Sequence, residues 1–160
     1  MRVRRVVDGE GEQLRAIRLR ALRDAPEAFG SSAEREAAYA PAVWAERAAG
    51  AETVTFVAVD GARWIGMAAG RPDGAVVQVL GMWVDPAARG AGAGRALLDA
   101  VAGWAAARGA ERLELGVTDR APAAAALYRA AGFVPTGEER PLPGDPPRVE
   151  RVLHRSLTIR

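Results

Sequence analysis

The chain has 160 residues, which suits a single domain, residues 1–160, with a substantial hydrophobic core. It has no cysteine and one histidine, His154, so disulfides, thiol nucleophiles and cysteine- or histidine-based metal sites are not expected. All 22 basic residues are arginine, yet the net charge is only +2 without a dense basic run, which argues against nucleic-acid binding. No apolar stretch approaches the roughly 20 residues of a membrane span, so we expect a cytoplasmic protein without membrane contact.

The first third of the chain reads as one strand followed by helices. Val3–Val7 is rich in strand-forming residues and ends at Asp8-Gly9, and a helix is expected from Glu10 to Asp24. The Glu10–Asp24 helix shows apolar residues at helical spacing: Leu14, Ile17, Ala21 and Leu22. A further short helix is expected around Ala42–Ala49.

The middle third reads as three antiparallel strands that lead into a glycine-rich loop. Val54–Val59 and Trp64–Ala69 flank Asp60-Gly61, a strong short hairpin signal. A second turn over 71–74 leads into a buried strand, Val76–Val84, which ends at Asp85-Pro86. Glycines at positions 90, 92 and 94 follow, and an apolar helical stripe runs from Arg95 through Trp104.

The last third adds one strand that must pair in parallel. The preceding helix ends near Gly109, and residues 113–117 alternate as a strand, so a right-handed crossover to a parallel partner is required. Pro122 begins another helix that Gly132 ends. Two strand candidates remain, Phe133–Gly137 and Val149–Leu157, separated by the proline-rich residues 141–147, for which we expect no regular structure.

These elements predict an α/β fold of the α+β kind. Its core is a mixed, mostly antiparallel central sheet with one parallel strand pair, flanked by helices. The glycine loop lies at the carboxyl end of a parallel strand, which is where ligands bind in sheets with helical crossovers.

The glycine loop has the properties of a phosphate cradle. Glycines let backbone N–H groups approach a ligand closely, and the following helix N-terminus adds unpaired donors and partial positive charge. The segment is not a Walker loop, because no Gly-Lys-Ser/Thr follows. It also fails the dinucleotide fingerprint, because Arg95 occupies the place of the last glycine.

At this loop the chain resembles the Gcn5-related N-acetyltransferases (GNAT superfamily). The family signature Arg/Gln-x-x-Gly-x-Gly/Ala is met by Arg89, Gly92 and Gly94. Two further blocks lie at the family's distances: residues 82–86 upstream, and Leu127-Tyr128 with Gly132-Phe133 downstream. The three blocks occur in the same order, and the resemblance covers most of the chain.

The resemblance implies acetyl-CoA as co-substrate, with its pyrophosphate on the loop and its pantetheine arm between two splayed parallel strands. A bulge is expected at Gly81. The Met82 N–H would stabilise the oxyanion, and Tyr128 matches the family tyrosine that protonates the coenzyme A sulfur. The expected cofactor-binding residues are Met82, Trp83, Val84, Arg89, Gly90, Ala91, Gly92, Ala93, Gly94, Arg95 and Tyr128.

The acceptor side is less well specified. In similar proteins the region after the first helix overlies the acceptor pocket, which makes Phe29 and Tyr39 candidates for lining it; ordinary core aromatics are the alternative, and the sequence favours it. Gln78 is a further acceptor-side candidate. A small-molecule amine, an amino acid and a protein amine all stay open as acceptors, and so do a monomer and a homodimer.

The sequence lacks the glutamates that relatives use as general base. The two family positions are occupied by Gln78 and Gly116, and a family asparagine is replaced by Ala121. We therefore expect no single essential base. Either the acceptor is weakly basic, or water carries its proton to a distant carboxylate such as Glu150 or Asp85. The missing glutamates also favour the alternative function, a regulatory domain that binds acyl-CoA without transfer.

Overall fold

The computed structural model describes residues 1–142 and 147–157 of the chain. Two short 3-10 turns lie at Pro26–Ala28 and Pro86–Ala88. The helices and strands, in chain order, are β1 (Arg2–Arg5), α1 (Gly11–Asp24), α2 (Ala33–Ala37), α3 (Pro41–Ala49), β2 (Val54–Asp60), β3 (Arg63–Asp73), β4 (Val76–Val84), α4 (Ala93–Ala107), β5 (Arg112–Thr118), α5 (Pro122–Ala130), β6 (Val134–Leu142) and β7 (Arg148–Ser156).

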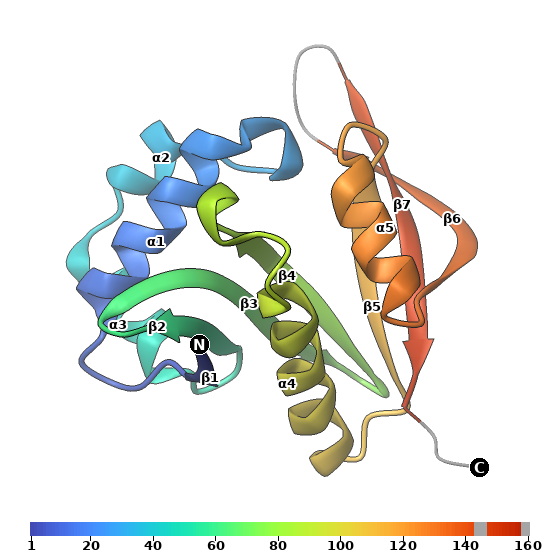
Figure 1. Ribbon diagram of the computed structural model, residues 1–160, viewed down its shortest axis with the longest axis horizontal. Coiled ribbons are helices and arrows are strands. Elements are labelled where there is room, and N and C mark those ends of the chain that lie inside the picture. Colours follow the sequence, from blue (N-terminus) through green and yellow to red (C-terminus); the bar gives the residue numbers. More distant parts are fainter. Residues whose placement is uncertain (143–146, 158–160) are drawn as a thin grey trace.

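The strands form one seven-stranded sheet in the order β1-β2-β3-β4-β5-β7-β6. All neighbours are antiparallel except β4 and β5, as the crossover through α4 requires. This parallel pair is short: it runs from Val76↔Arg112 to Gln78↔Glu114, and beyond these residues the two strands diverge (Figure 1). The predicted mixed sheet with one parallel, splayed pair is confirmed.

A bulge at Gly81 changes which side of the sheet β4 residues face. Gly81 has φ +61, and the β3 register moves from Ala69↔Leu80 to Met67↔Trp83, so β4 has one residue more than its partner here. Before the bulge, Val79 faces the core under α4; after it, Met82 does. The bulge predicted at Gly81 is confirmed.

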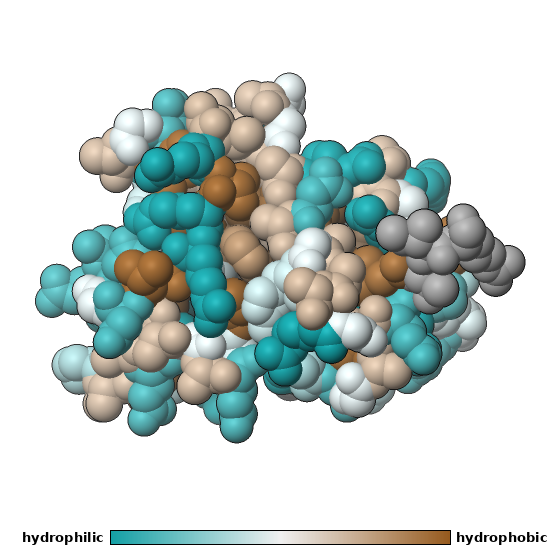
Figure 2. Space-filling view, turned by 90° about the horizontal axis from the view of Figure 1, so that it is seen from below, coloured by the Kyte–Doolittle hydropathy of each residue, from teal (hydrophilic) through white to brown (hydrophobic). Residues whose placement is uncertain are grey.

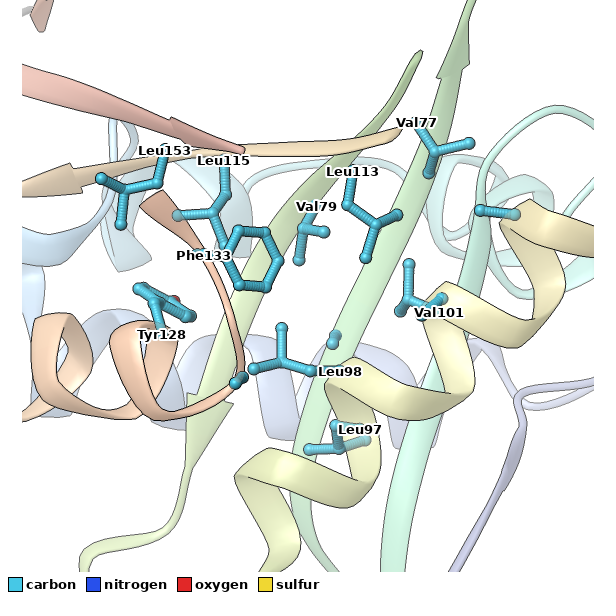
Figure 3. Packing of buried hydrophobic residues seen from close by; sticks show 14 of the residues in the cluster. Val77, Val79, Leu97, Leu98, Val101, Leu113, Leu115, Tyr128, Phe133 and Leu153 are labelled. Atoms are coloured by element: carbon cyan, nitrogen blue, oxygen red, sulfur yellow. The ribbon is translucent and has the colours of Figure 1, made fainter. Parts of the chain in front are cut away.

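One hydrophobic core lies between the sheet and helices α4 and α5. Leu97 and Leu98 of α4 are fully buried, each contributing about 1.5–3 kcal/mol by the usual burial estimate. Figure 3 shows Leu97, Leu98 and Val101 on the α4 side, Val77, Val79 and Leu113 on the strands, and Tyr128 and Phe133 beside Leu115 and Leu153.

A second core lies on the opposite face, under α1 and α3. The four apolar positions predicted for α1, from Leu14 to Leu22, are all buried here together with Trp44 of α3. Val57 of β2 faces this core whereas its neighbour Ala58 faces the first, as strand alternation requires. On the face drawn in Figure 2, hydrophobic and weakly hydrophobic residues adjoin one another in the middle, with hydrophilic residues on both sides.

Three predicted strands have clearly different bounds. The third strand, β3, runs to Asp73, so residues 71–73 of the turn expected over 71–74 pair with β4. The first ends at Arg5 and leaves Val7 exposed. The sixth runs to Leu142, so Pro141 and Leu142, for which no regular structure was expected, pair with Val149 and Arg148. The reason is position: β6 is an edge strand, where proline's missing N–H removes no necessary ladder bond. Of the rest of that expected irregular segment, Pro147 lies outside any strand, and residues 143–146 lie outside the described part.

A buried carboxylate, Asp85, ties the end of β4 to its surroundings. Its Oδ1 accepts a hydrogen bond from Ala87 N at 3.0 Å. Its Oδ2 accepts from Arg20 of α1 and, at 3.0 Å, from Arg63 of β3. The Ala87 hydrogen bond, followed by the two guanidinium groups, holds the pKa of Asp85 below its usual value. Asp85 is absent from the described lining of both large cavities, and its hydrogen bonds to Ala87, Arg20 and Arg63 make it a structural anchor at the end of β4.

Asp85→Asn should lower the free energy of unfolding by about 1.5–3 kcal/mol at pH 7, because hydrogen bonds to a charged acceptor are lost. The pKa of Asp85 is lower in the folded state than in the unfolded state, where it is about 3.9. The stabilisation is therefore fully present above about pH 3.9 and disappears as the pH falls through the folded-state pKa. Urea unfolding at pH 7 and pH 3 checks both statements. Asp60→Asn, at an exposed strand end, should change stability by less than about 0.5 kcal/mol. Equal effects of both variants at pH 7 would contradict the anchor role.

Candidate functional site

The glycine loop ends at the N-terminus of α4, and its glycines serve different purposes. Gly90 and Gly92 have φ values of +85 and +89, which other residues rarely adopt. Gly94 allows close packing, because a Cβ there would lie 2.7 Å from Leu127 Cδ2 and the leucine side chain would have to move. Gly92 is the N-cap of α4 and has no side chain to accept from the first helical N–H groups, which therefore remain available to a ligand.

The two loop arginines are held by the protein itself. Arg89 donates to Val84 O and to Asp24 Oδ2, both at 3.1 Å. Arg95 donates to Ala130 O at 3.1 Å and to Asp99 at 3.3 Å. Their side chains are about half exposed, 52% and 49%, so they add positive charge around the loop from fixed positions.

A cavity of about 570 Å³ lies against this loop. It brings together nearly all the expected cofactor-binding residues; Ala91 is exposed and is absent from the lining. Trp83 contributes to the lining, although its indole packs in the second core and donates to Asp24 at 2.9 Å. The lining residues from the expected set are Met82, Trp83, Val84, Arg89, Gly90, Gly92, Ala93, Gly94, Arg95 and Tyr128, joined by Ala121 and Leu127.

Tyr128 belongs both to the core and to this cavity. Its ring packs edge-on against Phe133, with centroids 5.9 Å apart, and the residue is only 6% exposed (Figure 3). Burial raises the pKa of the Tyr128 hydroxyl, so the group stays protonated at neutral pH. A phenol that lines a cavity in this state can donate a proton or a hydrogen bond.

Met82 lies where β4 has left its parallel partner. Pairing between β4 and β5 ends at Gln78, four residues earlier, and continues on the other side with β3. The β5-facing edge of β4 therefore lacks a strand partner beyond Gln78 in the described structure. Backbone groups along that edge can hydrogen-bond a ligand instead.

A second cavity, of about 560 Å³, lies on the other side of the bulge. Phe29 and Gln78 line it, as expected for acceptor-side residues, and Gln78 is only 7% exposed. Tyr39 does not line it; its ring packs against Trp44, with centroids 6.2 Å apart, as in the core alternative. Gly116 and Glu150 are neighbours in the lining of this cavity.

A buried ion-pair cluster at this cavity has no signal in the sequence pattern. Glu36, 2% exposed, accepts from Arg18 Nε and Nη2 at 3.0 Å and from Arg47 Nη1 at 3.1 Å. Burial acts to raise the pKa of Glu36, but the two arginines hold it below its usual value. Glu36 sits on the five-residue helix α2, where a charged residue in a polar stretch gives no indication of burial.

The described residues contain no helix long and apolar enough to cross a membrane. Within the same residues, no group of three or more histidine, aspartate or glutamate side chains is arranged to hold a metal ion.

The sequence is similar to acetyltransferases. The family model described as the acetyltransferase (GNAT) family matches residues 15–133. Mycothiol acetyltransferase from Beutenbergia cavernae is 42% identical over 76 residues, 48% of this chain and 26% of that protein. The chain therefore spans about a quarter of that relative's length.

Solved structures share the fold over nearly the whole chain. The ribosomal-protein-S18-alanine N-acetyltransferase from Escherichia coli has a TM-score of 0.74 at 19% identity, covering 99% of this chain and 95% of that one. PaiA N-acetyltransferase from Thermoplasma acidophilum, in complex with coenzyme A, has a TM-score of 0.76 at 13% identity, covering 97% and 98%. YncA from Salmonella typhimurium, solved with acetyl-CoA, has a TM-score of 0.75 at 19% identity, covering 100% and 95%.

Because their sequence identities are below 25%, these structures show only that the fold is shared. The family model, in contrast, matches the sequence of this chain over most of its length. The splayed strand pair, the glycine loop at the start of α4 and this sequence match agree, and the chain belongs to the acetyltransferase (GNAT) family.

Proposed function

We propose that residues 1–160 form one acetyl-CoA-dependent N-acetyltransferase domain, which moves the acetyl group to a primary amine by direct attack in a ternary complex. Family membership supports the reaction class, and coenzyme A or acetyl-CoA in two structures of this fold supports the co-substrate. The acceptor is a small-molecule amine or amino acid, or a protein amine.

The observation that carries this proposal is the meeting of two cavities on β4. The cavity at the glycine loop is lined by residues 82–84, and the second by residues 79–81. Both share Ala28 and Phe29. A thioester in the first cavity and an amine in the second would therefore meet at the bulge. A regulatory acyl-CoA-binding domain would need only the first cavity.

The loop would hold the cofactor pyrophosphate mainly through backbone N–H groups. Arg89 and Arg95 are bound to protein acceptors and add charge at a distance, whereas the first amides of α4 have no intrahelical partner. The pantetheine arm would follow the unpaired edge of β4 between Met82 and Val84.

The reacting groups would converge on Met82 and Tyr128. The amine nitrogen attacks the thioester carbonyl carbon, and the Met82 N–H stabilises the oxyanion that forms. When the carbon–sulfur bond breaks, Tyr128 gives its proton to the departing sulfur. The chain has no cysteine to carry the acetyl group between substrates, which favours a single direct transfer.

Turnover with a panel of amines tests the proposal. Released thiol should appear with at least one amine among alkylamines, amino acids, aminoglycosides and an N-terminal peptide. Varying both substrates should then give intersecting reciprocal plots, as a ternary complex requires. Parallel plots or a trapped acetyl-enzyme would refute direct transfer, and acetyl-CoA binding with no transfer would favour the regulatory alternative.

Gly92→Val should weaken acetyl-CoA binding about fivefold to 150-fold, because a β-branched residue at φ +89 strains the loop by about 1–3 kcal/mol. Arg89→Ala should cost less, since its guanidinium is half exposed and bound elsewhere. Calorimetry ranks the two. Gly103→Val, in the middle of α4 with open space around its Cβ position, is the matched control and should bind normally. Normal binding by folded Gly92→Val would mean that the cradle lies elsewhere.

Tyr128→Phe should lower turnover about a hundredfold to ten-thousandfold, because only the proton donor is removed while the ring still packs on Phe133. Acetyl-CoA affinity should stay within about threefold. Tyr39→Phe, which removes the hydroxyl of a tyrosine outside both cavities, is the control. An unchanged single-turnover rate for Tyr128→Phe would assign the residue to packing alone.

A further inference from the structure

Gly116 and Glu150 share one space in the second cavity. A Cβ built on Gly116 would lie 2.2 Å from Glu150 Oε2, 2.3 Å from its Cδ and 2.6 Å from its Oε1. Real Cβ atoms do not approach other atoms so closely, so the carboxylate occupies the volume that a side chain at position 116 would need. The missing side chain at Gly116 is what makes room for Glu150.

The strand register explains how Glu150 reaches this point. In the β5–β7 pair Gly116 lies opposite Val152, and Glu150 lies opposite Thr118. All four residues share one face of the sheet, because directly opposed residues in antiparallel strands do so. Glu150 therefore crosses diagonally onto the neighbouring strand and covers Gly116.

This position is beside the point where β4 and β5 separate. The last parallel pair is Gln78↔Glu114, and Gly116 lies two residues further along β5. Gln78, Gly116 and Glu150 all line the second cavity. The carboxylate thus faces the opening through which an amine would approach the bulge.

We propose that Glu150 is the proton acceptor for the attacking amine, acting from β7 in the space left open by Gly116. This proposal rests on the function proposed above. It replaces the sequence-based expectation that no single side chain serves as base.

The surroundings leave Glu150 free for this role. No described residue donates a hydrogen bond to its carboxylate, and it is the only carboxylate in the described lining of this cavity. Arg140, opposite Glu150 on β6, is already bound to Glu114 at 2.7 Å and Glu138 at 3.1 Å. The other charged groups in the lining are Arg18 from α1, Arg47 from α3 and Arg71 from β3.

Burial raises the pKa of Glu150, and the charge of Arg140 opposes this only in part. A carboxylate with a raised pKa is a stronger base. Glu150 is therefore suited to take a proton from the acceptor amine.

An ammonium acceptor gives one proton to the Glu150 carboxylate and becomes a neutral amine, whose lone pair forms the carbon–nitrogen bond. When the carbon–sulfur bond breaks, sulfur takes the Tyr128 proton, and the second nitrogen proton returns to Tyr128 directly or through water. Glu150 then releases its proton to solvent, so one proton is released per acetyl group transferred.

The test is kcat/KM against pH for Glu150→Gln with the best acceptor of the amine panel. At pH 7 an alkylamine of pKa about 10.4 is about 0.04% unprotonated, so the variant should lose about a hundredfold or more. Its deficit should shrink about tenfold per pH unit as the amine deprotonates by itself. Acetyl-CoA affinity should be unchanged. Glu139→Gln, an exposed carboxylate on β6, is the matched control and should behave as wild type.

Two further variants separate a base from a structural residue. Gly116→Ala should displace the carboxylate and reproduce the pH-dependent loss without removing any acid. Gly116→Asp combined with Glu150→Gly returns a carboxyl group to the space of the Glu150 carboxylate, because the carboxyl carbon of the aspartate would lie about 1.5 Å from the Cβ at position 116. It should recover at least tenfold over Glu150→Gln at pH 7.

A Glu150→Gln rate within about threefold of wild type at pH 7, or a loss that is constant across pH, would overturn the assignment while leaving the transferase proposal intact. A wild-type protein that binds acetyl-CoA but acetylates no amine would overturn both.

Discussion

The separation of β4 from β5 is the constraint on which the rest of the site depends. Three residue pairs join the strands, and then the extra residue at Gly81 turns β4 away. The separation exposes a row of backbone groups in the middle of a sheet, where they would otherwise be paired. On one face of the sheet, beside α4 and α5, lies the cavity at the glycine loop, and on the face of α1 and α3 lies the second cavity; their linings adjoin on β4 at residues 81 and 82.

Arginine–carboxylate clusters stabilise both sides of this opening. Asp85 joins the end of β4 to α1 and β3, and Glu36 joins α2 to Arg18 and Arg47. Breaking a buried pair leaves an uncompensated charge, so such clusters favour one arrangement of the elements over others. With all 22 basic residues being arginine, each cation can bind a carboxylate through two nitrogens, as Arg18 does with Glu36.

The glycines at the site illustrate three separate physical needs. Gly92 provides a backbone conformation, Gly94 provides close packing of α4 on α5, and Gly116 provides room for a side chain from another strand. The sequence cannot distinguish these three needs, because it shows only a glycine at each position. Only the neighbours in space distinguish them: open solvent, Leu127 and Glu150 respectively.

The sequence by itself determined the sheet with its parallel crossover, the buried face of α1, the glycine loop before α4 and the loop-side residues, because these depend on local periodicity and spacing. It did not determine the extent of β6 through Pro141, since that depends on β6 being an edge strand. Nor did it separate Phe29, which lines both cavities, from Tyr39, which packs on Trp44. The position of Glu150 over Gly116 was decided by the pairing of β5 with β7, which are far apart in the sequence, and such long-range register leaves no mark in either strand's own pattern.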